Sequence, residues 1–85
     1  MQEYIFSNHA LEQMNTRNIS TEIVSKILSK ADQILTQEGK KIYQSIINFE
    51  KEGKYLVRIF INTKKEPNVI ITVYRTSKIE KYYEG

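Results

Sequence analysis

The spacing of apolar residues changes near Asp32, from helical before it to alternating after it. In the N-terminal part, this spacing predicts one helix over Asn8–Thr16 and a second over Thr21–Lys30. Ser7 and Ser20 stand where each helix needs an N-cap. The apolar stripes of the two helices consist of Ala10, Leu11, Met14, Ile23, Val24, Ile27 and Leu28.

The rest of the chain is rich in Ile, Val, Tyr, Phe and Thr, which favour strands, and the turns between these segments are short enough for hairpins. The predicted strands are Gln33–Gln37, Lys41–Glu50, Tyr55–Asn62 and Asn68–Thr76. The apolar segment Tyr4–Phe6 is also expected to be extended. We therefore predict a single α+β domain over residues 1–85, with two N-terminal helices packed on one face of a four-stranded antiparallel sheet.

Alternation along the strands assigns their two faces and separates Arg58 from the core. A charge that interrupts an apolar strand must face solvent, a partner or an anion, so Arg58 marks the open face of the sheet. Thr72 and Tyr74 of the last strand are expected on the same face as Arg58. The predicted core consists of Ile23, Ile27, Leu28, Val57, Ile59, Ile71 and Val73.

The net charge of +3 is unevenly distributed along the 85 residues. Residues 1–50 carry five Lys/Arg and six Asp/Glu, a net charge of −1, whereas residues 51–85 carry eight and four, a net charge of +4. The basic C-terminal part is compatible with contact to RNA or another polyanion. A domain of this length has a small core, so a second copy or a partner that covers apolar surface is also compatible with it.

Several classes of site are excluded by composition. The chain has no cysteine, which removes disulfides, thiolate nucleophiles and cysteine-based zinc sites. Its single histidine and three glycines provide neither a metal cluster nor a phosphate-binding glycine loop, so we expect no metal and no cofactor. The N-terminal sequence lacks the pattern of a signal peptide, and no apolar run approaches a membrane span, so we expect a cytoplasmic protein without membrane attachment.

Beyond these general features, the chain resembles a known family over nearly its whole length. The resemblance is carried by Ser7–Ala10, Met14, Arg17, Ile19–Ser20, Val69–Tyr74, Lys78 and Tyr82. These residues resemble the bacterial family called domain of unknown function 4258. That family is grouped with the RelE/ParE-like, or barnase/colicin E5-like, fold, whose members are mostly toxins of toxin–antitoxin pairs and metal-independent ribonucleases. The resemblance implies this fold, a ribonuclease activity and a small antitoxin-type partner protein.

The resemblance also implies a catalytic site. Metal-independent RNA cleavage needs a base, an acid and cations that stabilise the phosphorane-like transition state. His9 would be the base, because a helix N-terminus disfavours imidazolium and leaves a neutral imidazole that accepts protons near pH 7. Arg17 and Arg58 would hold the phosphate, and Lys78 or Tyr74 would donate the proton or position the substrate. Residues expected to contact RNA are Thr72, Arg75, Lys81 and Tyr82.

Each of these residues also has a structural interpretation. His9 could cap or pack its helix, Arg17 could be a helix-end residue in solvent, and the tyrosines could serve packing. Arg58 could simply face solvent on an open sheet. The segment Lys78–Tyr83 could dock as a short edge strand.

One departure from the family bears on activity. The family usually has a second arginine next to the methionine, where this chain has Gln13, and a neutral amide cannot form the bidentate charged contact to phosphate. Two hypotheses follow, a toxin-like ribonuclease silenced by an antitoxin, and a non-catalytic toxin-like module that binds an antitoxin-type protein. Convergence of His9, Arg17 and Arg58 on one cleft favours the enzyme, and their dispersal favours the module.

Overall fold

Two serines begin the N-terminal helices, as their positions predict. The computed structural model describes residues 4–84 and places helices α1 at Asn8–Thr16 and α2 at Thr21–Ser29. The Ser7 hydroxyl accepts a hydrogen bond from the Ala10 amide at 3.0 Å, and the Ser20 hydroxyl accepts one from the Ile23 amide at 3.2 Å. These bonds satisfy amide groups that have no partner within the helix. The predicted start of each helix is confirmed, and α2 ends one residue earlier than predicted.

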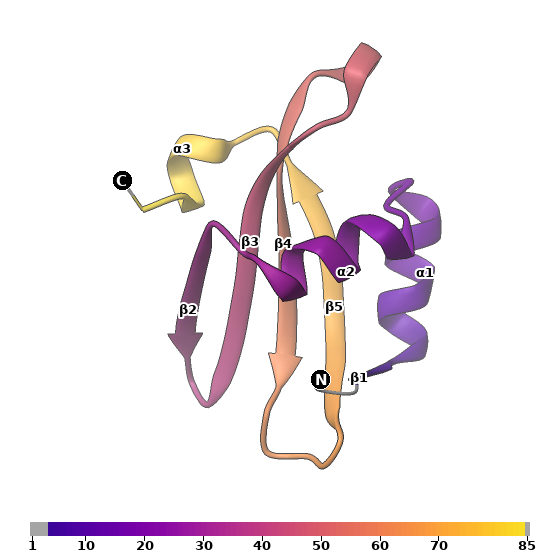
Figure 1. Cartoon of the computed structure of the whole chain (residues 1–85), viewed down its shortest axis with the longest axis vertical. Helices are drawn as coiled ribbons and strands as arrows, with labels where there is room; N and C mark the ends of the chain where they lie inside the picture. The colour runs from indigo at the N-terminus through magenta and orange to yellow at the C-terminus, as the bar shows by residue number, and fades with distance from the viewer. Residues whose placement is uncertain (1–3, 85) are drawn as a thin grey trace.

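The sheet differs from the predicted one in its first strand. Its strands are β1 (Tyr4–Phe6), β2 (Gln33–Gln37), β3 (Lys40–Asn48), β4 (Lys54–Asn62) and β5 (Asn68–Thr76). The five strands lie in the order β1-β5-β4-β3-β2, and β1 pairs with β5 in parallel while the other pairs are antiparallel (Figure 1). The predicted α+β class is therefore confirmed, but the sheet is mixed and five-stranded and not antiparallel and four-stranded. A three-residue strand shows no readable period, and its partner lies more than sixty residues away in sequence.

The C-terminal segment forms a third helix, so the edge-strand alternative was also wrong. Helix α3 (Ile79–Tyr82) is one turn long and lies beside β2 and β3, away from α1 (Figure 1). A single 3₁₀ turn at Glu50–Glu52 joins β3 to β4, and Gly53 follows it with φ 93°, a conformation that favours glycine.

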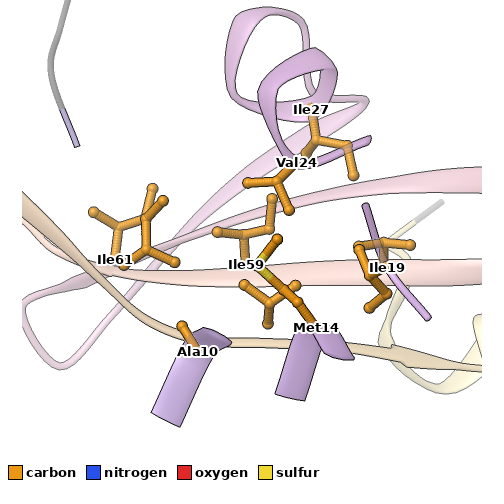
Figure 2. Packing of buried hydrophobic residues seen from close by; sticks show 10 residues of the cluster. Ala10, Met14, Ile19, Val24, Ile27, Ile59 and Ile61 are labelled. Carbon is orange, nitrogen blue, oxygen red and sulfur yellow. The ribbon is translucent and has the colours of Figure 1, made fainter. Parts of the chain in front are cut away.

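The core lies between the helices and one face of the sheet, called here the core face (Figure 2). Its buried residues are Ala10, Met14, Ile19, Val24, Ile27, Val57, Ile59, Ile61, Ile70 and Val73. Of the predicted core, Ile27, Val57, Ile59 and Val73 are confirmed, and Ile23 and Leu28 are partly buried against the cluster.

The prediction for Ile71 was wrong, because Ile70 takes the buried position. Ile59 pairs with Val73 and Ile61 pairs with Ile70, so the register shifts between Phe60 and Ile61. A bulge of this kind breaks strict alternation along the strand, which a sequence pattern cannot reveal.

The opposite side of the sheet, called here the Arg58 face, carries Ile42, Gln44, Leu56, Arg58, Phe60, Thr72 and Tyr74. Arg58 pairs directly with Gln44 on β3 and with Tyr74 on β5, and directly paired residues share a face. The predicted grouping of Arg58, Thr72 and Tyr74 on one face is therefore confirmed.

Candidate anion-binding site

Arg58 is a buried cation at the centre of the Arg58 face, with only 7% of its surface exposed. Its Nε donates a hydrogen bond to Gln44 Oε1 at 2.9 Å, and its Nη1 donates one to the Tyr74 hydroxyl at 2.8 Å. Both acceptors are neutral. Among the described residues no carboxylate forms an ion pair with Arg58. A buried charge without a counter-ion is costly, so this arrangement needs a reason.

Aromatic rings surround the guanidinium. Its central carbon lies 4.6 Å from the ring centroid of Tyr82, 5.3 Å from that of Phe60 and 5.9 Å from that of Tyr74. The Phe60 and Tyr74 rings stack on each other with centroids 6.0 Å apart. The negative faces of these rings partly compensate the charge of Arg58, by about 0.5 to 2 kcal/mol for each well-placed ring.

Gln44 fixes the position of Arg58, and sequence reasoning missed it. Its amide nitrogen donates to Gln33 Oε1 at 2.7 Å and to the carbonyl of Tyr82 at 3.2 Å, which turns its Oε1 towards Arg58. The Gln44 side chain is fully buried. One signal in the sequence could have identified Gln44. It is a polar residue within a strand, and a buried polar group needs hydrogen-bond partners.

A hollow opens beside the guanidinium. Its volume is about 310 Å³, and its lining consists of Leu35, Thr36, Gln37, Ile42, Arg58, Lys81, Tyr82 and Glu84. A second hollow of about 220 Å³ shares Gln37 and Ile42 with it and also contacts Phe60 and Lys40. The Arg58 face therefore offers a concave surface with two cations, Arg58 and Lys81, in the larger hollow.

Two of the other basic residues of the predicted catalytic site lie elsewhere. His9 is the second residue of α1, is exposed, and its imidazole has no hydrogen bond to another described residue. Arg17 caps the C-terminus of α1, where its Nε donates to Gln13 Oε1 at 2.9 Å. Helix α1 packs on the core face, whereas Arg58 faces the other way. His9, Arg17 and Arg58 therefore do not converge on one cleft.

Arg75, predicted to contact RNA, is engaged on the core side of the sheet. It pairs with Val57, and its Nη2 lies 2.6 Å from Glu52 Oε1 in an ion pair. Its guanidinium carbon lies 4.3 Å from the ring centroid of Phe49 and 4.6 Å from that of Tyr55. These contacts hold the β3–β4 turn against β5 and place Arg75 on the opposite face from Arg58.

The remaining predicted residues lie on or near the Arg58 face. Thr72 and Tyr74 belong to it, and Tyr82 and Lys81 reach it from α3. Lys78 precedes α3 and is exposed.

A separate hollow of about 450 Å³ lies on the helix side of the sheet. It is lined by Tyr4, Phe6, Thr21, Glu22, Val24, Ser25 and Leu28. Burial raises the pKa of the Tyr4 hydroxyl above its usual value of 10.0, and the neighbouring Tyr43 adds a smaller effect in the same direction. The phenol of Tyr4 is therefore neutral at physiological pH and provides no charge for binding.

Comparison with known proteins agrees with the resemblance found in the sequence. The family described as Domain of unknown function (DUF4258) matches residues 6–75, so the chain belongs to this family. Arg58, Gln44 and Tyr74 lie inside the matched region, and α3 lies outside it. No curated protein and no solved structure gives a match. Among the described residues, no helix is long and apolar enough to cross a membrane.

Proposed function

We propose that this chain is a toxin-like domain of the RelE/ParE type that binds single-stranded RNA by holding a backbone phosphate at Arg58. The buried guanidinium, which pairs with no carboxylate among the described residues, carries the proposal. A guanidinium has five N–H donors, and Arg58 uses two of them within the described residues. The remaining donors make no hydrogen bond to the described residues and can donate to an anion that enters the adjacent hollow.

The surroundings of Arg58 favour RNA among anions. Bases stack on aromatic side chains with about 1 to 3 kcal/mol per base, and Phe60 and Tyr74 of the sheet supply two rings next to the phosphate position. The C-terminal part of the chain, which contains Arg58, is its basic part. A small carboxylate would use the charge of Arg58 but not the rings.

Binding without turnover is the form of this function that the geometry supports better. A general base must come within hydrogen-bond reach of the proton that it removes. His9 lies on the core side of the sheet, and Gln13 engages the side chain of Arg17. The ribonuclease hypothesis needs His9 as the general base beside Arg58, and the position of His9 does not fit that role. In the proposed module, a small antitoxin-type protein would regulate RNA binding by covering the Arg58 face.

A cleavage and binding experiment separates the two hypotheses. Total RNA is incubated with wild type and with His9→Ala in excess chelator, and the affinity for a labelled single-stranded RNA is measured in parallel. We expect neither protein to cleave, and the two Kd values to agree within about twofold, because a residue outside the interface contributes little. Arg17→Ala serves as a second variant with the same expectation.

Two results would contradict this proposal. Cleavage by wild type that His9→Ala abolishes would restore the ribonuclease. Failure of folded wild type to bind RNA at low salt would remove RNA as the ligand, since phosphate contacts are strongest there.

A further inference from the structure

We propose that residues 78–84, called here the C-terminal cover, occupy the Arg58 site in the free protein and move aside when an RNA phosphate binds. This inference rests on the proposed function and adds a regulatory step to it. The cover contains α3 and ends on β2, where Gln33 and the backbone of Glu84 exchange hydrogen bonds.

The cover occupies the space that a ligand needs. Of the three rings around Arg58, that of Tyr82 is nearest, 4.6 Å from the guanidinium carbon. Tyr82 and Glu84 also form one wall of the 310 Å³ hollow. A base that stacks on the guanidinium from this hollow therefore competes with the Tyr82 ring for the same place. The Tyr82 ring makes a cation–π contact with the guanidinium, as the ring of a bound base would.

Hydrogen bonds hold the cover in place. Helix α3 has four residues and none of them is buried. A helix of one turn has no stability of its own, so its position depends on the contacts it makes. The side-chain amide of buried Gln44 donates to the Tyr82 carbonyl, and the Gln33 side chain and the Glu84 backbone exchange two hydrogen bonds at the surface. The two surface bonds exchange readily with water, in contrast to the apolar contacts of α1 and α2 with the core.

With a cover, the apparent affinity of the site is its intrinsic affinity multiplied by the fraction of time that the cover is open. Weakening the cover should therefore tighten RNA binding, although the cover itself contributes an aromatic ring. The opposite expectation holds if Tyr82 is part of the RNA-binding surface, because its removal would then weaken binding. The sign of the change in affinity decides between the two.

The first test uses the full chain with Tyr82→Ala and, as a matched control, Tyr83→Ala. Tyr83 is the adjacent tyrosine, and its ring has no contact with Arg58 among the described residues. We expect Tyr82→Ala to bind a labelled single-stranded RNA about fivefold or more tightly than wild type, since a cover that is mostly closed suppresses affinity by the open fraction. Tyr83→Ala should stay within about twofold of wild type.

Gln33→Ala is the second variant; it releases the end of the cover and also removes one acceptor of the Gln44 amide, while Gln44 keeps its hydrogen bond to Arg58. It should also tighten RNA binding. In wild type, bound RNA should accelerate tryptic cleavage after Lys81, which lies in the cover. Cleavage after Lys64, in the exposed β4–β5 turn, gives the reference rate.

The outcomes separate this inference from the proposed function. Weaker or unchanged binding by both Tyr82→Ala and Gln33→Ala, or slower cleavage after Lys81 with RNA, overturns the cover. If Arg58→Met binds RNA as well as wild type, the proposed function itself fails, whatever the Tyr82 and Gln33 variants do.

Discussion

Arg58→Met is expected to lower the affinity for single-stranded RNA by roughly 30-fold or more while leaving the protein folded. Loss of a central arginine contact costs about 2 kcal/mol or more, and each 1.4 kcal/mol corresponds to about tenfold in Kd. Methionine fills a similar space between Phe60, Tyr74 and Tyr82 but carries no charge and no donor. The measurement is a titration of labelled RNA at fixed low salt.

The stability of this variant tests why Arg58 is there. Replacing an uncompensated buried charge with an apolar side chain is often neutral or stabilising, by about 1 to 4 kcal/mol. Leaving Gln44 Oε1 and the Tyr74 hydroxyl without their donor costs about 1 to 3 kcal/mol. These effects largely cancel, so the melting temperature should move by less than about 8 °C.

Arg58→Lys is the matched control for charge without the guanidinium. It should bind RNA with intermediate affinity, because an ammonium lacks the bidentate geometry. A folded Arg58→Met protein that binds RNA like wild type would contradict the assignment. Unfolding of Arg58→Met would instead make Arg58 a structural residue.

Ile59→Ala is expected to have the largest effect on stability. Ile59 is fully buried between β4 and the helices, next to Val24 and Met14 (Figure 2). Truncating such a residue costs about 2 to 5 kcal/mol, a large share of the roughly 4 to 13 kcal/mol expected for a domain of this length. The melting temperature should fall by at least about 10 °C.

Ile34→Ala is the matched control for this loss of volume. Ile34 lies on the edge strand β2 and is 53% exposed, so its truncation should change stability by about 0.5 kcal/mol or less. Thermal unfolding of both variants gives the comparison. Equal effects at the two positions would show that Ile59 is no more deeply buried than Ile34, which would contradict its place in the core.

Local signals made most of the fold predictable. Ser7 and Ser20 mark helix starts through hydrogen bonds within three residues, so the sequence around them is sufficient. The long strands are equally predictable, because apolar and polar residues alternate along them. The extended conformation of Tyr4–Phe6 was predicted, but neither its pairing with β5 nor the helix α3 was, because both segments are too short to show a period and depend on partners far away in sequence.

The site was predictable only in part for the same reason. A charge in an apolar strand identified Arg58, and alternation placed it correctly beside Thr72 and Tyr74. Nothing local indicates that Gln44 lies opposite Arg58, since that depends on the β3–β4 register. Likewise, the distribution of charge along the sequence could not show that Arg75 turns to Glu52 on the core side.

The most direct test of RNA binding at Arg58 is the NMR signal of its Nε–H group during titration with a single-stranded RNA oligonucleotide. This hydrogen is bonded to Gln44 Oε1 in the free protein, so a phosphate that reaches the guanidinium must change its environment. We expect the Arg58 Nε–H signal to shift strongly and saturably, together with backbone amides of β3, β4 and β5. An unchanged Arg58 signal, with shifts gathered on α1 around His9 and Arg17, would contradict the account and place the RNA on the other side of the sheet.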